Sequence, residues 1–128
     1  MDITPLVKED SMIIQGYGPG AIRIGGQSYN QPVLVLSDQV LLWDYKKSAN
    51  DLVLADCDIL KEHSDNIDVV LFGGGEGMPS IDALRRQEFR ENGIGLEPMD
   101  TGAACRTFNV LLAEGRRVAA LLIPSSSL

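Results

Sequence analysis

The chain has 128 residues, a formal net charge of −7 and 45% hydrophobic residues. This length and composition predict one soluble globular domain over residues 1–128, with a hydrophobic core of its own. The acidic balance argues against general nucleic-acid binding, and no apolar run approaches the roughly 18 residues that suggest a membrane span. Residues 1–6 have neither the basic nor the apolar region of a signal peptide, so we expect a cytoplasmic location.

The first half of the chain is predicted to be rich in β-strands. Five segments either alternate in hydrophobicity or are continuously apolar. These segments are residues 12–15, 21–24, 27–29, 32–36 and 39–43. Residues 16–20 are rich in glycine and are predicted to form a turn, whereas Gly25 and Gly26 fit a two-residue hairpin turn. We expect these strands to lie antiparallel at a sheet edge or in a small packed layer.

The second half alternates between helix and strand. Helices are predicted over residues 55–63, 80–92 and 101–114, and strands over residues 69–72, 94–98 and 118–123. This α-β-α-β-α-β order indicates right-handed crossovers and a largely parallel sheet. The fold class is therefore α/β, with a β-rich first half.

Apolar residues and caps orient the predicted helices. Ile81, Leu84 and Phe89 are expected to share one face of the second helix. The third helix is expected to begin after a cap provided by Asp100 or Thr101, and to end at Gly115.

A glycine-rich loop follows the buried strand over residues 69–72. Gly73, Gly74 and Gly75 precede Glu76, and a plausible helix start follows at residues 79–80. A strand, a glycine loop and a helix in this order often form an anion site, because backbone N–H groups at a helix N-terminus are unpaired. The loop lacks the G-x-G-x-x-G spacing and the lysine of a P-loop, and Glu76 would repel a phosphate. The alternative is a tight turn that needs positive φ angles.

Two residues of the third helix are candidates for the same site. Arg106 can hold a carboxylate or phosphate, and Asn109 lies three residues further on the helix. They would lie near the loop if both segments share a sheet edge. The hypothetical site for a small anionic ligand therefore comprises Gly73, Gly74, Gly75, Arg106 and Asn109. The alternative is structural: Arg106 pairs with an acid such as Asp100, and Asn109 hydrogen-bonds a loop.

Other reactive residues give weaker signals. Two cysteines are too few for a disulfide framework, but Cys105 lies beside Arg106 in the first helical turn, where a thiol pKa falls. Cys105 is therefore either a nucleophile or a small core residue. His63 with Glu62, Asp65 and Asp68 could form a metal or acid–base centre, although a solvated helix end explains these residues too. No catalytic residue, metal site or cofactor is assigned.

Three blocks of sequence carry a family resemblance. They are residues 17–24 with 40–43, residues 69–75, and residues 94–124. Together they resemble a small α/β family of mostly uncharacterised proteins that includes the mitochondrial complex I (NADH dehydrogenase) assembly factor 3 and the adipogenesis-associated domain protein. The resemblance covers nearly the whole chain. It implies a three-layer sandwich with a central mixed sheet in which one strand is antiparallel to the rest.

The resemblance also shapes the functional hypotheses. The family has no agreed reaction or cofactor, and its eukaryotic branch acts through protein contacts during assembly of the respiratory NADH dehydrogenase. Without a transit segment, this chain resembles the prokaryotic, chiefly bacterial, members. The family often has Gly-Thr-Gly at the loop, whereas this chain has Gly74 at the middle position. We therefore predict a non-enzymatic protein-interaction or assembly-factor-like protein with an unidentified protein partner. The alternative is a binding protein or enzyme for a small anionic ligand, using residues 73–77 with Arg106 and Asn109.

Overall fold

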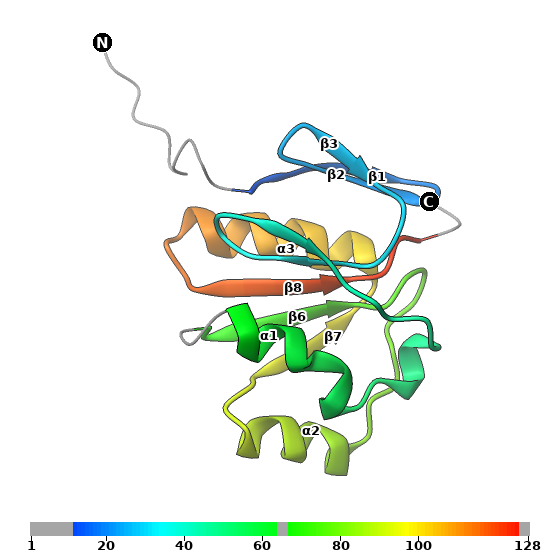
Figure 1. Ribbon diagram of the computed structural model, residues 1–128, viewed down its shortest axis with the longest axis vertical. Helices are drawn as coiled ribbons and strands as arrows, with labels where there is room; N and C mark the ends of the chain where they lie inside the picture. The colour runs from blue at the N-terminus through cyan, green and yellow to red at the C-terminus, as the bar shows by residue number, and fades with distance from the viewer. Residues whose placement is uncertain (1–11, 64–66, 126–128) are drawn as a thin grey trace.

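The computed structural model describes residues 12–63 and 67–125, which form two sheets and three α-helices (Figure 1). A five-stranded sheet has the order β5-β4-β8-β6-β7, and a three-stranded sheet has the order β1-β2-β3. The strands are β1 (Ile14–Gly18), β2 (Ala21–Ile24), β3 (Gln27–Tyr29), β4 (Val33–Val35), β5 (Val40–Leu42), β6 (Val69–Gly73), β7 (Leu96–Met99) and β8 (Val118–Leu122). The helices are α1 (Asp58–His63), α2 (Ala83–Glu91) and α3 (Thr101–Ala113), with short 3-10 turns η1 (Ala49–Asp51) and η2 (Leu54–Cys57).

Strand directions confirm a mixed central sheet. Strand β6 runs parallel to both β7 and β8. Strand β4 is antiparallel to both β8 and β5, so β4 alone runs against the other four strands. The predicted α/β class and the single reversed strand are both confirmed.

The central sheet lies between two layers of helices. Residues alternate across β6, so that Val70 and Phe72 face one core cluster and Leu71 faces the other. Helices α1 and α2 cover the first face, and α3 covers the second, with the small sheet packed outside α3 (Figure 1). Helix α3 therefore lies between the two sheets, and its residues Ala104 and Phe108 are fully buried there.

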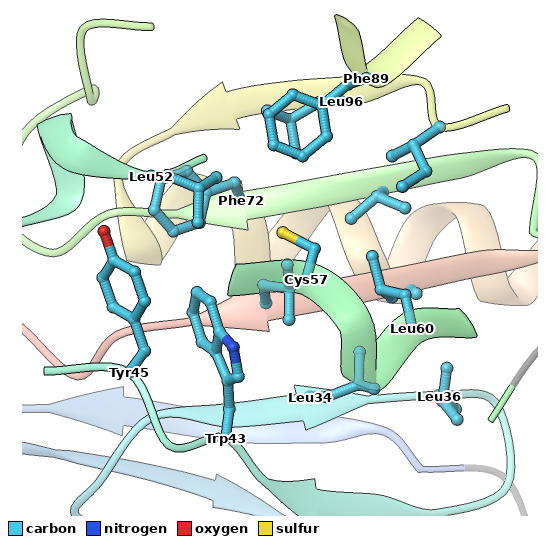
Figure 2. Close-up of a cluster of buried hydrophobic side chains, with 14 residues drawn as sticks. Leu34, Leu36, Trp43, Tyr45, Leu52, Cys57, Leu60, Phe72, Phe89 and Leu96 are labelled. Carbon is cyan, nitrogen blue, oxygen red and sulfur yellow. The ribbon is translucent and has the colours of Figure 1, made fainter. Parts of the chain in front are cut away.

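Aromatic side chains organise the core beneath α1 and α2 (Figure 2). Trp43 and Tyr45 stack with their ring centroids 4.4 Å apart, and the Phe72 ring meets the Trp43 ring edge-on at 6.1 Å. Trp43 Nε1 donates to the Asp56 carbonyl at 2.9 Å, and the Tyr45 hydroxyl donates to the Ser48 carbonyl at 2.6 Å. The polar ends of both rings are thus paired, which lets their apolar bodies be buried. Burial raises the pKa of Tyr45 to about 12.

Local turn and cap signals are confirmed at two places. Gly25 and Gly26 have φ angles of 56° and 87°, as a β2–β3 hairpin turn requires. The Asp100 side chain accepts from the Ala103 N–H at 2.8 Å, so Asp100 rather than Thr101 is the N-cap of α3.

Two local predictions are wrong. Leu84 is 81% exposed although Phe89 is fully buried, because five helical residues turn the side chain by about 140°. Residues Gly16–Gly18 belong to β1, which is irregular between Ile14 and Gly16, and the turn itself falls at Gly20, where φ is 71°.

Candidate functional site

The glycine loop lines a pocket at the carboxyl ends of β6 and β8. The pocket has a volume of about 420 Å³ and is lined by residues 48–50, 74–79 and 123–125. In open α/β sheets, ligands bind outside the carboxyl ends of the strands. The loop therefore lies where the sequence placed a candidate site, with Gly74 and Gly75 on the pocket wall.

Thr101 ties the glycine loop to its neighbours. The Gly75 N–H donates to Thr101 Oγ1 at 2.8 Å, and the Thr101 N–H donates to the Gly75 carbonyl at 2.9 Å. The Thr101 hydroxyl in turn donates to the Ile123 carbonyl at 2.5 Å. The Gly74 N–H donates to the Met99 carbonyl at 3.0 Å. The amides of Gly74 and Gly75 are thus engaged by the protein itself and do not point at a ligand.

These bonds close the usual ligand crevice of this sheet. The chain leaves β6 toward α2 on one face and leaves β7 toward α3 on the other. A pair of neighbouring strands with such divergent connections normally frames the binding crevice. Here the Gly75–Thr101 bonds bridge that crevice. The pocket lies instead between the loop and the chain that follows β8.

Each predicted loop glycine has a steric reason. A Cβ atom at Gly73 would lie 3.0 Å from the Thr101 Cα, and one at Gly74 would lie 2.1 Å from the Pro79 Cγ. Gly75 has a φ of 100°, which disfavours side chains. The loop is therefore a tight glycine-dependent turn, although Gly75 alone among residues 73–77 has the positive φ angle that the alternative required at several positions. Gly74 and Gly75 of that turn also line the pocket.

Arg85 fixes the opposite wall of the pocket. Arg85 Nη1 donates to the Asn50 carbonyl at 2.7 Å and to the Leu52 carbonyl at 2.9 Å. Its Nη2 donates to the Ser80 carbonyl at 3.0 Å, and the Ser80 N–H donates to Asn50 Oδ1 at 2.7 Å. The backbone N–H and guanidinium of Arg85 hold the pKa of the Asp82 carboxyl below its usual range. Arg85 thereby joins η1 to the segment that precedes α2.

Arg106 and Asn109 attach the small sheet to α3. Asn109 Oδ1 accepts from the Ile14 N–H at 2.9 Å, and Asn109 Nδ2 donates to the Ile14 carbonyl at 2.8 Å. Arg106 donates to the Tyr17 hydroxyl, with its guanidinium carbon 5.9 Å from the centre of the Tyr17 ring. Neither residue lines the pocket. The structure thus brings Gly74 and Gly75 together with residues 48–50 and 123–125. Arg106 and Asn109 lie on α3 and contact β1 instead.

The cysteine and histidine candidates lie in separate places. Asp68 pairs with Arg117 at 2.8 Å, and this hydrogen-bonded guanidinium lowers the pKa of Asp68. His63 ends α1, and Asp65 lies outside the described residues. Burial raises the pKa of the Cys105 thiol to about 12 despite the opposing effect of Arg106, and it raises the pKa of Cys57 to about 12 as well.

Both thiols are therefore expected to react slowly with Ellman's reagent in the native protein. Thiolate is the nucleophile, and these raised pKa values make it scarce near neutral pH. At about pH 8 we expect a rate at least about 100-fold below that of the same protein in guanidinium chloride. Mass spectrometry of the labelled peptides separates the two sites. Rapid labelling of Cys105 in folded protein would instead support a nucleophilic cysteine.

The fold and the loop together define a small α/β protein with a central mixed sheet and a sealed β6–β7 crevice. The profile of the family described as "Protein of unknown function (DUF498/DUF598)" matches residues 14–123, and the chain belongs to this family. An uncharacterised protein of Rhodobacter capsulatus is 34% identical over 111 residues, which are 87% of this chain and 83% of the relative. A crystal structure from Bordetella parapertussis has a TM-score of 0.80 and 28% identity, covering 89% of this chain and 96% of that one.

An assembly factor is also among the relatives. The NADH dehydrogenase (ubiquinone) 1 alpha subcomplex assembly factor 3 of Danio rerio is 32% identical over 112 residues. This match covers 88% of the present chain but 64% of the assembly factor. The predicted family resemblance is thereby confirmed, and the protein is homologous to assembly factors. Over residues 12–63 and 67–125, no helix is long and apolar enough to cross a membrane.

Sequence reasoning missed two residues that shape the site, Thr101 and Arg85. Thr101 was recognised only as a possible helix cap, although it follows β7 at the edge where the glycine loop also emerges. That shared edge was the available signal, because the carboxyl ends of parallel strands lie together. For Arg85 the sequence offered only its position near a helix start, since two of its three carbonyl partners, Asn50 and Leu52, lie 35 and 33 residues away.

Proposed function

We propose that this protein is a non-enzymatic, assembly-factor-like protein that acts by binding another protein. The observation that carries this proposal is its homology to assembly factor 3 over 88% of the chain. Because the chain spans 64% of that relative, the identity of the partner is not transferred with the homology. The expected cytoplasmic location belongs to the same proposal.

The geometry of the glycine loop supports a binding rather than a catalytic role. The amides of Gly74 and Gly75, which could have stabilised a developing negative charge, are bonded to Met99 and Thr101. Cys105 is held mainly as a thiol by its raised pKa. These features favour a loop that maintains the fold over one that performs a reaction.

Affinity capture at physiological salt tests this proposal. The tagged protein should recover the same partner in repeated captures, and excess untagged protein should displace that partner. The displacement control separates a saturable surface from adhesion to the resin. Failure to recover any displaceable partner, with or without chemical cross-linking, would overturn the proposed function.

A small anionic ligand is the second candidate, and the pocket beside Gly74 and Gly75 favours it. In this candidate the pocket wall at Gly74 and Gly75 binds the ligand, whereas Arg106 and Asn109, which the sequence also suggested, bond to β1 outside the pocket. A panel of nucleotides, phosphates and carboxylic acids should then raise the melting temperature of the protein. A panel that leaves the melting temperature unchanged would refute this candidate.

A pocket-filling variant sharpens that test. A Cβ at Gly77 meets no atom within 4 Å, so Gly77→Met starts a side chain in open space at a residue that lines the pocket. We expect Gly77→Met to abolish the ligand-induced shift. Gly18→Met is the matched control, because Gly18 is equally unobstructed and does not line the pocket. Equal shifts in both variants would place the ligand elsewhere.

A further inference from the structure

The two edge strands of the five-stranded sheet differ in whether their outer backbone groups can pair with another strand. Those of β7 cannot pair along its full length. The Val70 N–H donates to the Gly95 carbonyl and the Gly74 N–H donates to the Met99 carbonyl. By the alternation of a parallel ladder, Leu96 and Pro98 present their backbone groups to the outer edge. Proline has no N–H to offer there, and Arg86 Nη2 donates to the Leu96 carbonyl at 3.3 Å. Strand β7 is thus protected against pairing with another chain.

Within residues 12–63 and 67–125, the β5 edge has neither a proline nor a side-chain donor of this kind. The Leu36 N–H donates to the Gln39 carbonyl and the Trp43 N–H donates to the Pro32 carbonyl, each at 2.9 Å. The alternation of an antiparallel ladder therefore directs the backbone groups of Val40 and Leu42 outward. Within the described part of the chain, strand β5 pairs only with β4. The Leu42 side chain is 57% exposed beside these outward groups.

Acidic residues flank this open edge. Asp38 precedes β5 and Asp44 follows it, and both are exposed. Asp44 contacts Lys46 at 3.7 Å, and both of those side chains are 89% exposed. Such a pair is largely screened by solvent and leaves the acidic character of the edge in place. The edge therefore offers a short apolar stretch between two negative charges.

We propose that the β5 edge binds an extended segment of a partner protein, which adds a strand to the five-stranded sheet. This inference rests on the proposed function, because it supplies the surface for the partner. The segment has apolar side chains at alternate positions and Lys or Arg at both ends, to complement Val40, Leu42 and the flanking Asp38 and Asp44. Strand addition of this kind draws its affinity from backbone hydrogen bonds and its specificity from alternate side chains.

A second copy of this chain fits the edge less well. Antiparallel self-pairing centred on Leu41 uses both Val40 and Leu42 of each copy, but it places Asp38 opposite Asp44. Like charges directly opposite each other destabilise strand pairing, and each copy also carries a net charge of −7. A basic partner segment gains from the same charges.

A peptide probe tests the surface independently of any natural partner. The probe is Lys-Thr-Val-Thr-Val-Thr-Lys, and the control is Glu-Thr-Val-Thr-Val-Thr-Glu. Amide hydrogen exchange measured by NMR should show new protection at Val40 and Leu42, whose N–H groups face outward. The Glu peptide should bind at least about tenfold more weakly. Unchanged exchange and unchanged chemical shifts at Val40 and Leu42 with millimolar Lys peptide would overturn the proposal.

Two variants locate the contact. Leu42→Pro removes the outward N–H without removing a β4–β5 hydrogen bond. We expect it to weaken binding of the Lys peptide at least about tenfold. Leu42→Thr keeps that N–H and the strand propensity, and should weaken binding less than about threefold. The double substitution Asp38→Asn with Asp44→Asn should remove the preference for the Lys peptide over the Glu peptide, whether or not Leu42→Pro folds fully.

Capture experiments separate this proposal from the proposed function. If the wild-type protein retains a displaceable partner that Leu42→Pro loses and Leu42→Thr keeps, the β5 edge is the binding surface. If Leu42→Pro is folded and keeps the partner, the edge proposal fails while the proposed function stands. If light scattering instead shows a dimer that Leu42→Pro dissociates, the occupant is a second copy and the partner-segment proposal is overturned.

Discussion

Replacing Thr101 with valine is expected to lower the free energy of unfolding by about 3 kcal/mol, measured by urea denaturation. Valine keeps the shape of threonine but loses the hydroxyl, which accepts from the buried Gly75 N–H and donates to the Ile123 carbonyl. Two backbone groups would then lack partners in an interior where Thr101 itself is fully buried. The loss should also loosen the glycine loop, so the Gly75 amide should exchange faster.

Serine provides the matched control at this position. Thr101→Ser keeps both hydrogen bonds and removes one methyl group, so we expect a loss of about 1 kcal/mol. The difference between the two variants isolates the hydroxyl from the packing. If Thr101→Val were as stable as Thr101→Ser, the hydroxyl would not hold the loop and the two bonds would contribute nothing measurable.

Replacing Phe72 with alanine is expected to cost about 4 kcal/mol in the free energy of unfolding. Phe72 is fully buried on β6 of the five-stranded sheet and packs edge-on against both Trp43 and Tyr45 (Figure 2). Truncation to alanine removes the ring and leaves a cavity that neighbouring aromatic side chains fill only in part. Thermal or chemical denaturation followed by Trp43 fluorescence measures the loss.

Leu84→Ala is the control for the Phe72 variant. Leu84 is 81% exposed, so removing its side chain should change the free energy of unfolding by less than about 0.5 kcal/mol. A double-mutant cycle of Phe72→Leu and Tyr45→Leu, measured by the free energy of unfolding, should give a coupling energy of about 1 kcal/mol from the edge-on ring contact. If Phe72→Ala lowered the free energy of unfolding by as little as Leu84→Ala does, the packing described for this core would be contradicted.

Local signals made much of the fold predictable. The hairpin at Gly25 and Gly26 and the cap at Asp100 each depend on residues close in sequence. The apolar run over residues 69–72 identified the buried strand β6 for the same reason. Leu84 was misplaced because hydrophobicity alone does not say which of two angularly separated apolar residues faces the core.

The contacts that define the site were not predictable from local pattern. Gly75 bonds to a hydroxyl 26 residues away, and Asn109 bonds to Ile14 across 95 residues. Such tertiary hydrogen bonds depend on how the sheet and helices pack, which no short motif encodes. The sequence therefore located the glycine loop correctly, but it could not indicate that the loop amides are used by the protein or that Asn109 fastens β1.

The bond between Asn109 and Ile14 also bears on the order of events during synthesis. Strand β1 leaves the ribosome well before α3, yet its attachment through Asn109 requires a residue made 95 positions later. Strand β4 likewise cannot complete its pairing until β8 has been synthesised, since Val33 pairs with Leu122. The N-terminal strands therefore remain without their final neighbours until translation is nearly complete, and the apolar faces of β2 and β4 are exposed to other nascent chains and chaperones during that interval.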